Sequence, residues 1–273
     1  MAGKIYVVGT PIGNLGDFSP RAAEVLSSVD LIAAEDTRVT AKLLNHFGIK
    51  AKTVSYYEHN KNQKGAYLIE RVLAGDNLAI VSDAGMPAIS DPGEDIVREA
   101  HKAGIKVEAV PGPSAVITAL SISGFPSGRF CFEGFLSVNR ISRKKHLEQI
   151  KNETRTLVFY EAPHKLLKTL TDMLDVLGER DICIIKELTK LHEQVLFFNF
   201  SEAVSYFTEN APRGEYVLII KGANEQEKEV MEPQEAIELA KKLMKNGLSA
   251  SAAAKEASAL SGIKKGDIYK AII

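Results

Sequence analysis

Short β-branched runs bounded by glycine or proline alternate with amphipathic stretches in the first part of the chain. The runs predict strands, and the hydrophobic positions between them recur at helical spacing. The predicted strands are Lys4–Gly9, Asp30–Ala34, Thr53–Tyr57, Leu78–Ser82 and Lys106–Val110. The predicted helices are Ser19–Ser28, Thr40–Phe47, Lys64–Ala74 and Pro92–Ala103. This alternation predicts an α/β domain with a mostly parallel sheet, which we place at residues 1–112.

The pattern restarts after Pro111-Gly112-Pro113 and predicts a second α/β domain at residues 113–222. Its predicted strands are Phe130–Leu136, Thr156–Tyr160, Ile182–Glu187, Val195–Phe200 and Glu215–Lys221. Only a short polar loop precedes the fourth of these strands, which favours antiparallel pairing with the third.

The polar, acidic segment Gly222–Pro233 is typical of a linker. Three short helical patterns with glycine-containing turns follow it and predict a helix-turn-helix-like domain at residues 233–273. This region has seven Lys against four acidic residues. The alternative is a plain helical cap that packs on the core or on a partner chain.

The whole chain has 34 Lys and Arg against 35 Asp and Glu, and 45% of its residues are hydrophobic. These values exclude a disordered chain and argue against unspecific nucleic-acid binding, although local basic patches remain compatible with them. The two cysteines lie in apolar runs, and the six histidines show no paired ligand spacing, so we expect buried thiols and no metal site. We find no signal peptide and no membrane span, and therefore expect a cytoplasmic protein.

Several loops that follow predicted strands are rich in Gly and Pro. Ser82–Gly93 holds two of each, and such a rigid loop presents backbone groups to a ligand. Gly9–Gly16 lacks both the dinucleotide and the P-loop fingerprints. Val110–Ala115 leads into a predicted helix, and Tyr160–His164 and Lys186–Glu193 follow strands of the second domain. Because such loops meet at one sheet edge, they predict a small-molecule site in the interdomain cleft.

These motifs resemble the RNA-modifying branch of the tetrapyrrole methylase-like, class III S-adenosylmethionine-dependent enzymes. The resemblance covers residues 3–222 and extends to the helical tail. The motifs that carry it are Gly9–Leu15, Ala34–Arg38, Ser82–Gly93, Pro111–Ala115, Tyr160–His164, Glu187–His192 and Gly214–Val217. Two positions depart from the pattern, since Ser137 stands where Pro is expected and Lys186 where Arg is expected.

The resemblance implies two α/β domains with S-adenosylmethionine in the cleft between them, and a homodimer. It implies methylation of the ribose 2′-hydroxyl of a cytidine in the decoding centre of 16S RNA in the small ribosomal subunit. The residues that it places against the cofactor are Pro11, Asp83, Met86, Ile89, Ser114, Ala115, Tyr160, Leu188 and Gly214.

Methyl transfer from a sulfonium is an in-line displacement, so positioning is most of the task. A side chain that accepts the hydroxyl proton adds about 10²–10⁴-fold. We predict that Asp36 or Glu187 accepts this proton and that Lys186 holds the oxygen. The alternative is that Glu35, Asp36 and Arg38 form a structural cap and an ion pair.

Eight cationic residues crowd between Arg129 and Arg155, with Phe130, Phe132 and Phe135 nearby. Clustered cations attract phosphates, and an aromatic ring can stack on a splayed base. The predicted RNA-binding residues are Arg140, Arg143, Lys144, Lys145, Lys264 and Lys265. The alternative is a solvated helix face beside aromatic residues of core strands.

Two other function classes remain open at the level of sequence. One is a methylase of the same fold that acts on a small tetrapyrrole. The other is a non-enzymatic RNA-binding or assembly protein.

Overall fold

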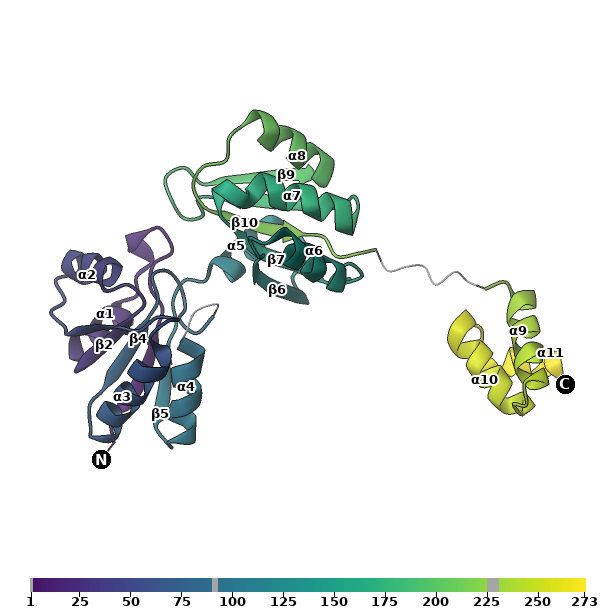
Figure 1. The fold of residues 1–273 in the computed structure, drawn as a ribbon, viewed down its shortest axis with the longest axis horizontal. Helices are drawn as coiled ribbons and strands as arrows, with labels where there is room; N and C mark the ends of the chain where they lie inside the picture. Colours follow the sequence, from purple (N-terminus) through teal and green to yellow (C-terminus); the bar gives the residue numbers. More distant parts are fainter. Residues whose placement is uncertain (1, 90–92, 225–230) are drawn as a thin grey trace. The chain divides into compact units, whose positions relative to one another are not determined.

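The structure is a computed structural model that describes residues 2–89, 93–224 and 231–273. The chain forms two units, Met1–Lys151 with Arg155–Lys221, and Asn152–Thr154 with Gly222–Ile273. The first unit contains two five-stranded sheets and the second contains three helices (Figure 1). Residues 90–92 of the Ser82–Gly93 loop and 225–230 of the predicted linker lie outside the described residues.

The first sheet is wholly parallel, with the strand order β3-β2-β4-β1-β5. Its strands are β1 (Lys4–Val8), β2 (Leu31–Ala34), β3 (Thr53–Ser55), β4 (Leu78–Val81) and β5 (Lys106–Val110). The helices of this region are η1 (Leu15–Asp17), α1 (Pro20–Ser28), α2 (Thr37–His46), α3 (Lys61–Leu73) and α4 (Gly93–Lys102). The prediction of an α/β region with a parallel sheet is confirmed.

Helices cover both faces of this sheet, because alternate residues of each buried strand point to opposite sides. In β4, Leu78 and Ile80 pack with α3 and α4, whereas Ala79 and Val81 pack with α1 and α2. Figure 1 shows the two helix pairs on the two sides of the strands. We call this sheet and its helices the first lobe. The strands β2 and β4 are buried on both faces, which explains why they read as continuous apolar runs, whereas the edge strands β3 and β5 keep exposed residues.

The second sheet is mixed, with the order β6-β7-β10-β8-β9. Its strands are β6 (Phe130–Phe135), β7 (Thr156–Glu161), β8 (Asp181–Lys186), β9 (Gln194–Asn199) and β10 (Tyr216–Ile220). β6 is parallel to β7, whereas β10 is antiparallel to both of its neighbours and β8 is antiparallel to β9. The predicted antiparallel pairing of the third and fourth strands is therefore confirmed.

Four helices complete what we call the second lobe. They are α5 (Ala115–Ser123), α6 (Arg140–Gln149), α7 (Pro163–Leu177) and α8 (Phe200–Glu209). α5 packs on one face of the sheet, and α6, α7 and α8 pack on the other. Among the described residues, no helix is long and apolar enough to cross a membrane. Cys183 is buried, as predicted, whereas Cys131 is partly exposed.

The second unit holds α9 (Pro233–Lys245), α10 (Ala250–Ser261) and α11 (Lys265–Ile272), as the helical patterns predicted. Ser249 caps α10 through its side-chain oxygen, which accepts a hydrogen bond from the Ala252 amide at 3.3 Å. The small core of this unit consists of five alanines and Ile268. Alanine side chains let three short helices pack closely.

Candidate cofactor and substrate site

A cavity of about 610 Å³ is lined by loops at strand ends of both lobes. Eight of the nine residues predicted to contact the cofactor line it: Asp83, Met86, Ile89, Ser114, Ala115, Tyr160, Leu188 and Gly214. The ninth, Pro11, is not among the lining residues, although its neighbour Ile12 is. The structure thus brings together residues that lie more than 130 positions apart in the chain.

Loops of the first lobe approach each other closely at the base of this cavity. Thr10 and Gly85 exchange two backbone hydrogen bonds of 3.0 and 3.2 Å. A Cβ atom on Gly9 would lie 2.6 Å from the Gly112 Cα and 2.7 Å from the Met86 sulfur. Glycine is therefore required where the loops after β1 and β5 pass each other.

The helix α5 begins at the cavity. Ser114 occupies the N-cap position, but its side chain makes no capping hydrogen bond and instead lines the cavity together with Ala115. The cavity therefore meets a helix N-terminus, which carries partial positive charge.

The loop after β8 forms part of the second-lobe wall through Leu188. Its neighbours Glu187 and Thr189 have φ angles of 53° and 66°, in the left-handed region that non-glycine residues rarely adopt. The Thr189 hydroxyl is buried and has no hydrogen-bond partner within the described residues. Such strain and unsatisfied polarity concentrate at functional sites.

Two acidic side chains of the first lobe, Glu35 and Asp83, line the cavity at the ends of the adjacent strands β2 and β4. The Asp83 amide donates a hydrogen bond of 3.3 Å to Glu35 Oε2, and Asp83 Oδ1 accepts one of 3.0 Å from the Asp36 amide. Burial is the main cause that raises the pKa of Asp83. The first-lobe wall of the cavity therefore offers the carboxylates of Glu35 and Asp83, and the second-lobe wall combines apolar residues with Glu161 and Glu215.

The contacts of Asp36 argue against the prediction that it accepts the proton. Its side chain caps α2, accepts from the Arg38 amide at 2.8 Å and pairs with the Arg38 guanidinium at 2.6 Å. These hydrogen bonds hold the pKa of Asp36 at about 2, and the residue does not line the cavity. A carboxylate so stabilised is a poor proton acceptor, so the geometry supports the alternative of a cap and an ion pair.

Glu187 and Lys186 also lie outside the cavity lining. Glu187 Oε1 accepts from the Glu215 amide at 2.9 Å and from Lys190 Nζ at 3.0 Å. Burial acts to raise the pKa of Glu187. The hydrogen bonds from Lys190 and from the Glu215 amide together have the larger, opposite effect, so the pKa lies below its ordinary value. These contacts make Glu187 a support for the loop before β10 and favour this role over that of a proton acceptor.

Sequence reasoning did not single out Glu161, which lines the cavity and is only 2% exposed. Its carboxylate accepts from Lys165 at 2.7 Å, Thr169 at 2.6 Å and the Ala162 amide at 2.8 Å. The signal that could have found it is an acid at the end of an apolar strand, followed four positions later by a lysine on a helix.

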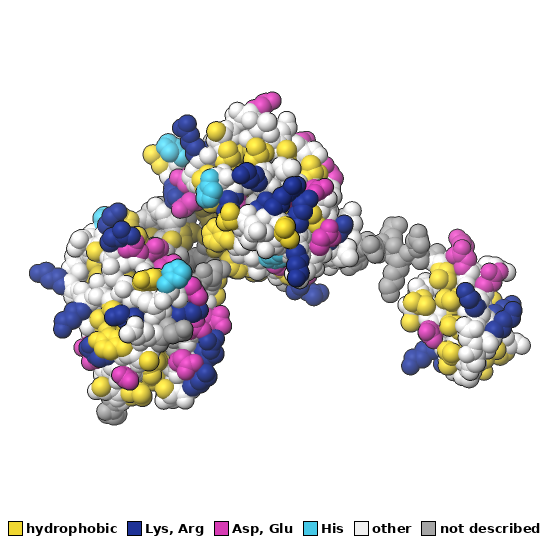
Figure 2. Space-filling view, in the orientation of Figure 1, with side chains coloured by type: hydrophobic (Ala, Val, Ile, Leu, Met, Phe, Trp, Pro, Cys, Tyr) yellow, Lys and Arg dark blue, Asp and Glu magenta, His cyan; other side chains and the backbone are white. Residues whose placement is uncertain are grey.

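The predicted RNA-binding cations differ in exposure. Arg140 and Lys145 are exposed, although Arg140 also pairs with Asp172 at 3.1 Å, and Lys144 forms an ion pair with Asp175. Figure 2 shows Lys and Arg side chains gathered on the face of the second lobe that carries α6 and α7. In the other unit, Lys264 and Lys265 are also exposed.

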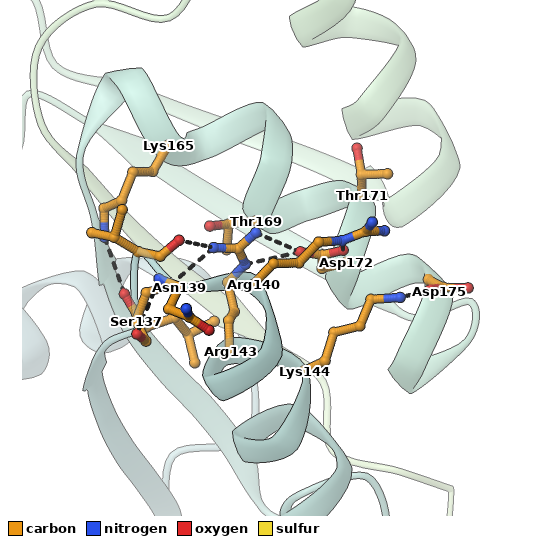
Figure 3. Close-up of polar contacts among 12 residues, drawn as sticks. Ser137, Asn139, Arg140, Arg143, Lys144, Lys165, Thr169, Thr171, Asp172 and Asp175 are labelled. Carbon is orange, nitrogen blue, oxygen red and sulfur yellow. Dashed lines mark hydrogen bonds and ion pairs between the residues drawn. The ribbon is translucent and has the colours of Figure 1, made fainter.

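The prediction for Arg143 is wrong, because its residue is only 4% exposed. Its guanidinium donates to Asp172 at 2.6 and 2.9 Å, and to the carbonyls of Ser137 and Val138 at 2.9 and 3.1 Å (Figure 3). With these donors occupied inside the protein, Arg143 does not contact a phosphate and instead ties α6 to α7.

Comparisons with known proteins agree with this geometry. A family model described as Tetrapyrrole (Corrin/Porphyrin) Methylases matches residues 4–204. A solved diphthine synthase has a TM-score of 0.61 at 14% identity, covering 80% of this chain and 89% of its own. Uroporphyrin-III C-methyl transferase from Thermus thermophilus, complexed with S-adenosyl homocysteine, has a TM-score of 0.57 at 18% identity, covering 80% and 97%. The fold and the cavity define an S-adenosylmethionine-dependent methyltransferase of the tetrapyrrole methylase type.

Relatives with higher sequence identity show which family within this class the chain belongs to. Proteins named ribosomal RNA small subunit methyltransferase I are 45% identical in Synechocystis, covering 98% of this chain and 96% of the relative, and 46% identical in Escherichia coli O157:H7, covering 98% and 94%. One from Thermotoga maritima, 46% identical, matches 81% of this chain over 99% of its own length. The chain belongs to this family of ribosomal RNA methyltransferases.

The residues of the cavity fit S-adenosylmethionine, which is the cofactor of this enzyme. Its apolar walls suit an adenine ring and a methylene chain, and Asp83 supplies an acceptor for a hydroxyl or an ammonium group. The uncapped Ser114 hydroxyl adds a second polar contact at the start of α5. Among the described residues, no group of three or more His, Cys, Asp and Glu side chains is placed to hold a metal ion.

Proposed function

We propose that this protein methylates the ribose 2′-hydroxyl of a cytidine in the decoding centre of 16S RNA. The observation that carries the proposal is the cavity lined by eight residues predicted to contact the cofactor. Phe135 lines the same cavity and lies five positions before the exposed cation Arg140. A cofactor site beside exposed positive charge suits a polyanionic substrate better than a neutral one.

The chain contributes mainly by positioning the reactants. When bound, S-adenosylmethionine supplies an electrophilic methyl group for an in-line displacement. Asp83, Ser114 and the apolar residues Met86 and Leu188 would hold it. Asp36 and Glu187 then have structural roles, since their carboxylates form ion pairs with Arg38 and Lys190.

We further propose that the enzyme acts as a homodimer in the cytoplasm on the small ribosomal subunit. The proposed substrate supports this location, and the resemblance to the RNA-modifying branch supports the dimer. The exposed Lys264 and Lys265 of the helical unit would add phosphate contacts. The Thermotoga maritima relative matches only 81% of this chain, which suggests that a shorter chain performs the core reaction.

Labelled S-adenosylmethionine tests the proposal against its two alternatives. We expect transfer of label to small ribosomal subunits that lack the modification, and none to a tetrapyrrole such as uroporphyrinogen III. Transfer only to the tetrapyrrole would replace the proposed substrate, and binding of subunits without any transfer would indicate an assembly protein.

Truncation after Gly222 tests the role of the helical unit. Retained cofactor binding together with weakened methylation of subunits would support RNA contacts by this unit. Loss of the dimer after truncation would instead indicate a role in assembly, which analytical ultracentrifugation can measure.

A further inference from the structure

Phe135, the last residue of β6, differs from the other aromatic residues of its strand. Phe130 and Phe132 pack against the core cluster beside α5. Phe135 is 59% exposed and lines the cofactor cavity. An exposed phenyl ring at a cavity marks a surface built for a ligand rather than for the core.

A one-residue bulge puts the ring on this face. In the register of β6 with β7, Phe132 pairs with Val158, but Gly134 pairs with Phe159 and Phe135 with Tyr160. Without the shift, Phe135 would point to the opposite face, because side chains alternate along a strand. Gly134 has a φ of 65°, which glycine adopts without strain.

Neighbouring side chains hold the ring in place. The Tyr160 ring centroid lies 5.4 Å from that of Phe135, and Lys165 Nζ lies 5.6 Å from the Phe135 centroid. Lys165 also pairs with the buried Glu161 at 2.7 Å and donates to the Leu136 carbonyl at 3.2 Å. Tyr160 and Lys165 therefore contact the ring, while the residue as a whole keeps more than half of its surface exposed.

The backbone that follows Phe135 is held just as firmly. Three consecutive carbonyls, those of Leu136, Ser137 and Val138, accept hydrogen bonds from the ammonium of Lys165 and the guanidinium of Arg143 (Figure 3). These two cations are paired with buried carboxylates of β7 and α7. Rigid support of this kind pre-organises a binding surface and lowers the entropy cost of binding.

The charges on α6, which follows Phe135 in the chain, indicate the class of its partner. Arg140, which begins α6, has a side chain that is 68% exposed, and Lys145 is exposed one turn further on. Arg140 Nε also pairs with Asp172 at 3.1 Å, which leaves the rest of its exposed guanidinium free to meet a phosphate. An aromatic platform with exposed cations on the helix that follows it is an arrangement that binds single-stranded nucleic acid, in which bases stack and phosphates pair.

We propose that Phe135 is the stacking platform for the base of the nucleotide to be methylated. This inference rests on the proposed function and names a substrate contact within it. Stacking on Phe135 would fix the nucleotide at the edge of the cavity, with its phosphates toward Arg140 and Lys145.

The test uses unmethylated small ribosomal subunits and the full-length enzyme. F135A should lower kcat/KM for subunits by about 10- to 100-fold, as expected for one lost base stack, and should weaken subunit binding in a filter assay. F135W and F135Y should restore the activity, whereas F135L, which is apolar but not aromatic, should not. The matched control is F197A, because Phe197 is also 59% exposed but lies outside the cavity lining.

The outcomes separate this inference from the proposed function. Wild-type activity of F135A or F135L, an equal loss of S-adenosylmethionine affinity in F135A, or dissociation of an oligomer by F135A would overturn the stacking assignment. If the wild type binds subunits through Phe135 but transfers no methyl group, Phe135 remains a base-stacking residue for RNA and the proposed reaction fails. If the wild type neither binds nor methylates subunits, both are overturned.

Discussion

Two charged stretches that follow β2 and β6 are built in opposite ways. After β2, Asp36 pairs with Arg38 two positions away, and the Arg38 side chain is 86% exposed. After β6, Arg143 pairs with Asp172 across 29 positions, and both side chains are at most 5% exposed. The first pair serves a local helix start, whereas the second holds the loop that presents Phe135. Charge by itself therefore does not tell a surface contact from an internal support.

The largest effect should come from breaking the buried pair. D172A leaves the Arg143 guanidinium buried without its carboxylate and should lower the free energy of unfolding by about 3–5 kcal/mol. Urea denaturation followed by circular dichroism measures this. The control is D175A, since Asp175 is on the same helix and pairs with Lys144, but its side chain is 59% exposed. D175A should change stability by less than about 1 kcal/mol. Equal stability of the two variants would contradict the contrast.

An intermediate effect should come from the exposed cations of α6. R140Q/K145Q should weaken subunit binding and make its salt dependence shallower, by about 1.4 in the slope of log K against log salt for two lost single-strand phosphate contacts. Binding titrations from low to moderate salt measure this slope. K102Q/K106Q neutralises two lysines of the first lobe, both exposed, as a control. An unchanged slope in R140Q/K145Q would remove α6 from the RNA surface.

The smallest effect should come from the pair after β2, in which Arg38 is exposed and Asp36 is partly buried. D36N should retain most of the methylation rate at neutral pH, whereas loss of a true proton acceptor would cost about 100-fold or more. Steady-state kinetics with small subunits decides between the two, with cofactor affinity measured as a control.

The effect of D36N on the free energy of unfolding should also depend on pH. Because the folded pKa of Asp36, about 2, lies below its ordinary value of 3.8, its stabilising effect is present above that ordinary value. It is lost as the pH falls through about 2. The stability difference between wild type and D36N should therefore be constant near neutral pH and shrink between pH 4 and pH 2. A difference that grows on acidification would contradict this cap.

Much of the fold could be predicted from local pattern. Parallel strands that are buried on both faces read as apolar runs such as Leu78–Val81, and glycine or proline ends them. The position of the cofactor cavity could also be predicted, because loops that follow parallel strands meet at one edge of the sheet. The second sheet was predicted less fully, since its order depends on long-range pairing of β10 between β7 and β8.

The remaining features depend on tertiary contacts that no spacing encodes. Arg143 sits among cations of α6, and only its position opposite Asp172 of α7 removes it from the surface. Phe135 lies on the other face of the sheet because of one bulge near Gly134. A prediction that assumes strict alternation of side chains along a strand cannot find such a bulge. Glu161 is ionically paired inside the protein, where a charged residue at a strand end would ordinarily be assigned to solvent.

The most direct test of the central claim is mass-spectrometric mapping of the methylated nucleotide. Unmodified small subunits would be incubated with the enzyme and S-adenosylmethionine, and the 16S RNA digested and sequenced by mass. We predict one added methyl group on the ribose of a single cytidine in the decoding centre. A methyl group on a base, at scattered sites or on no RNA at all would contradict the account.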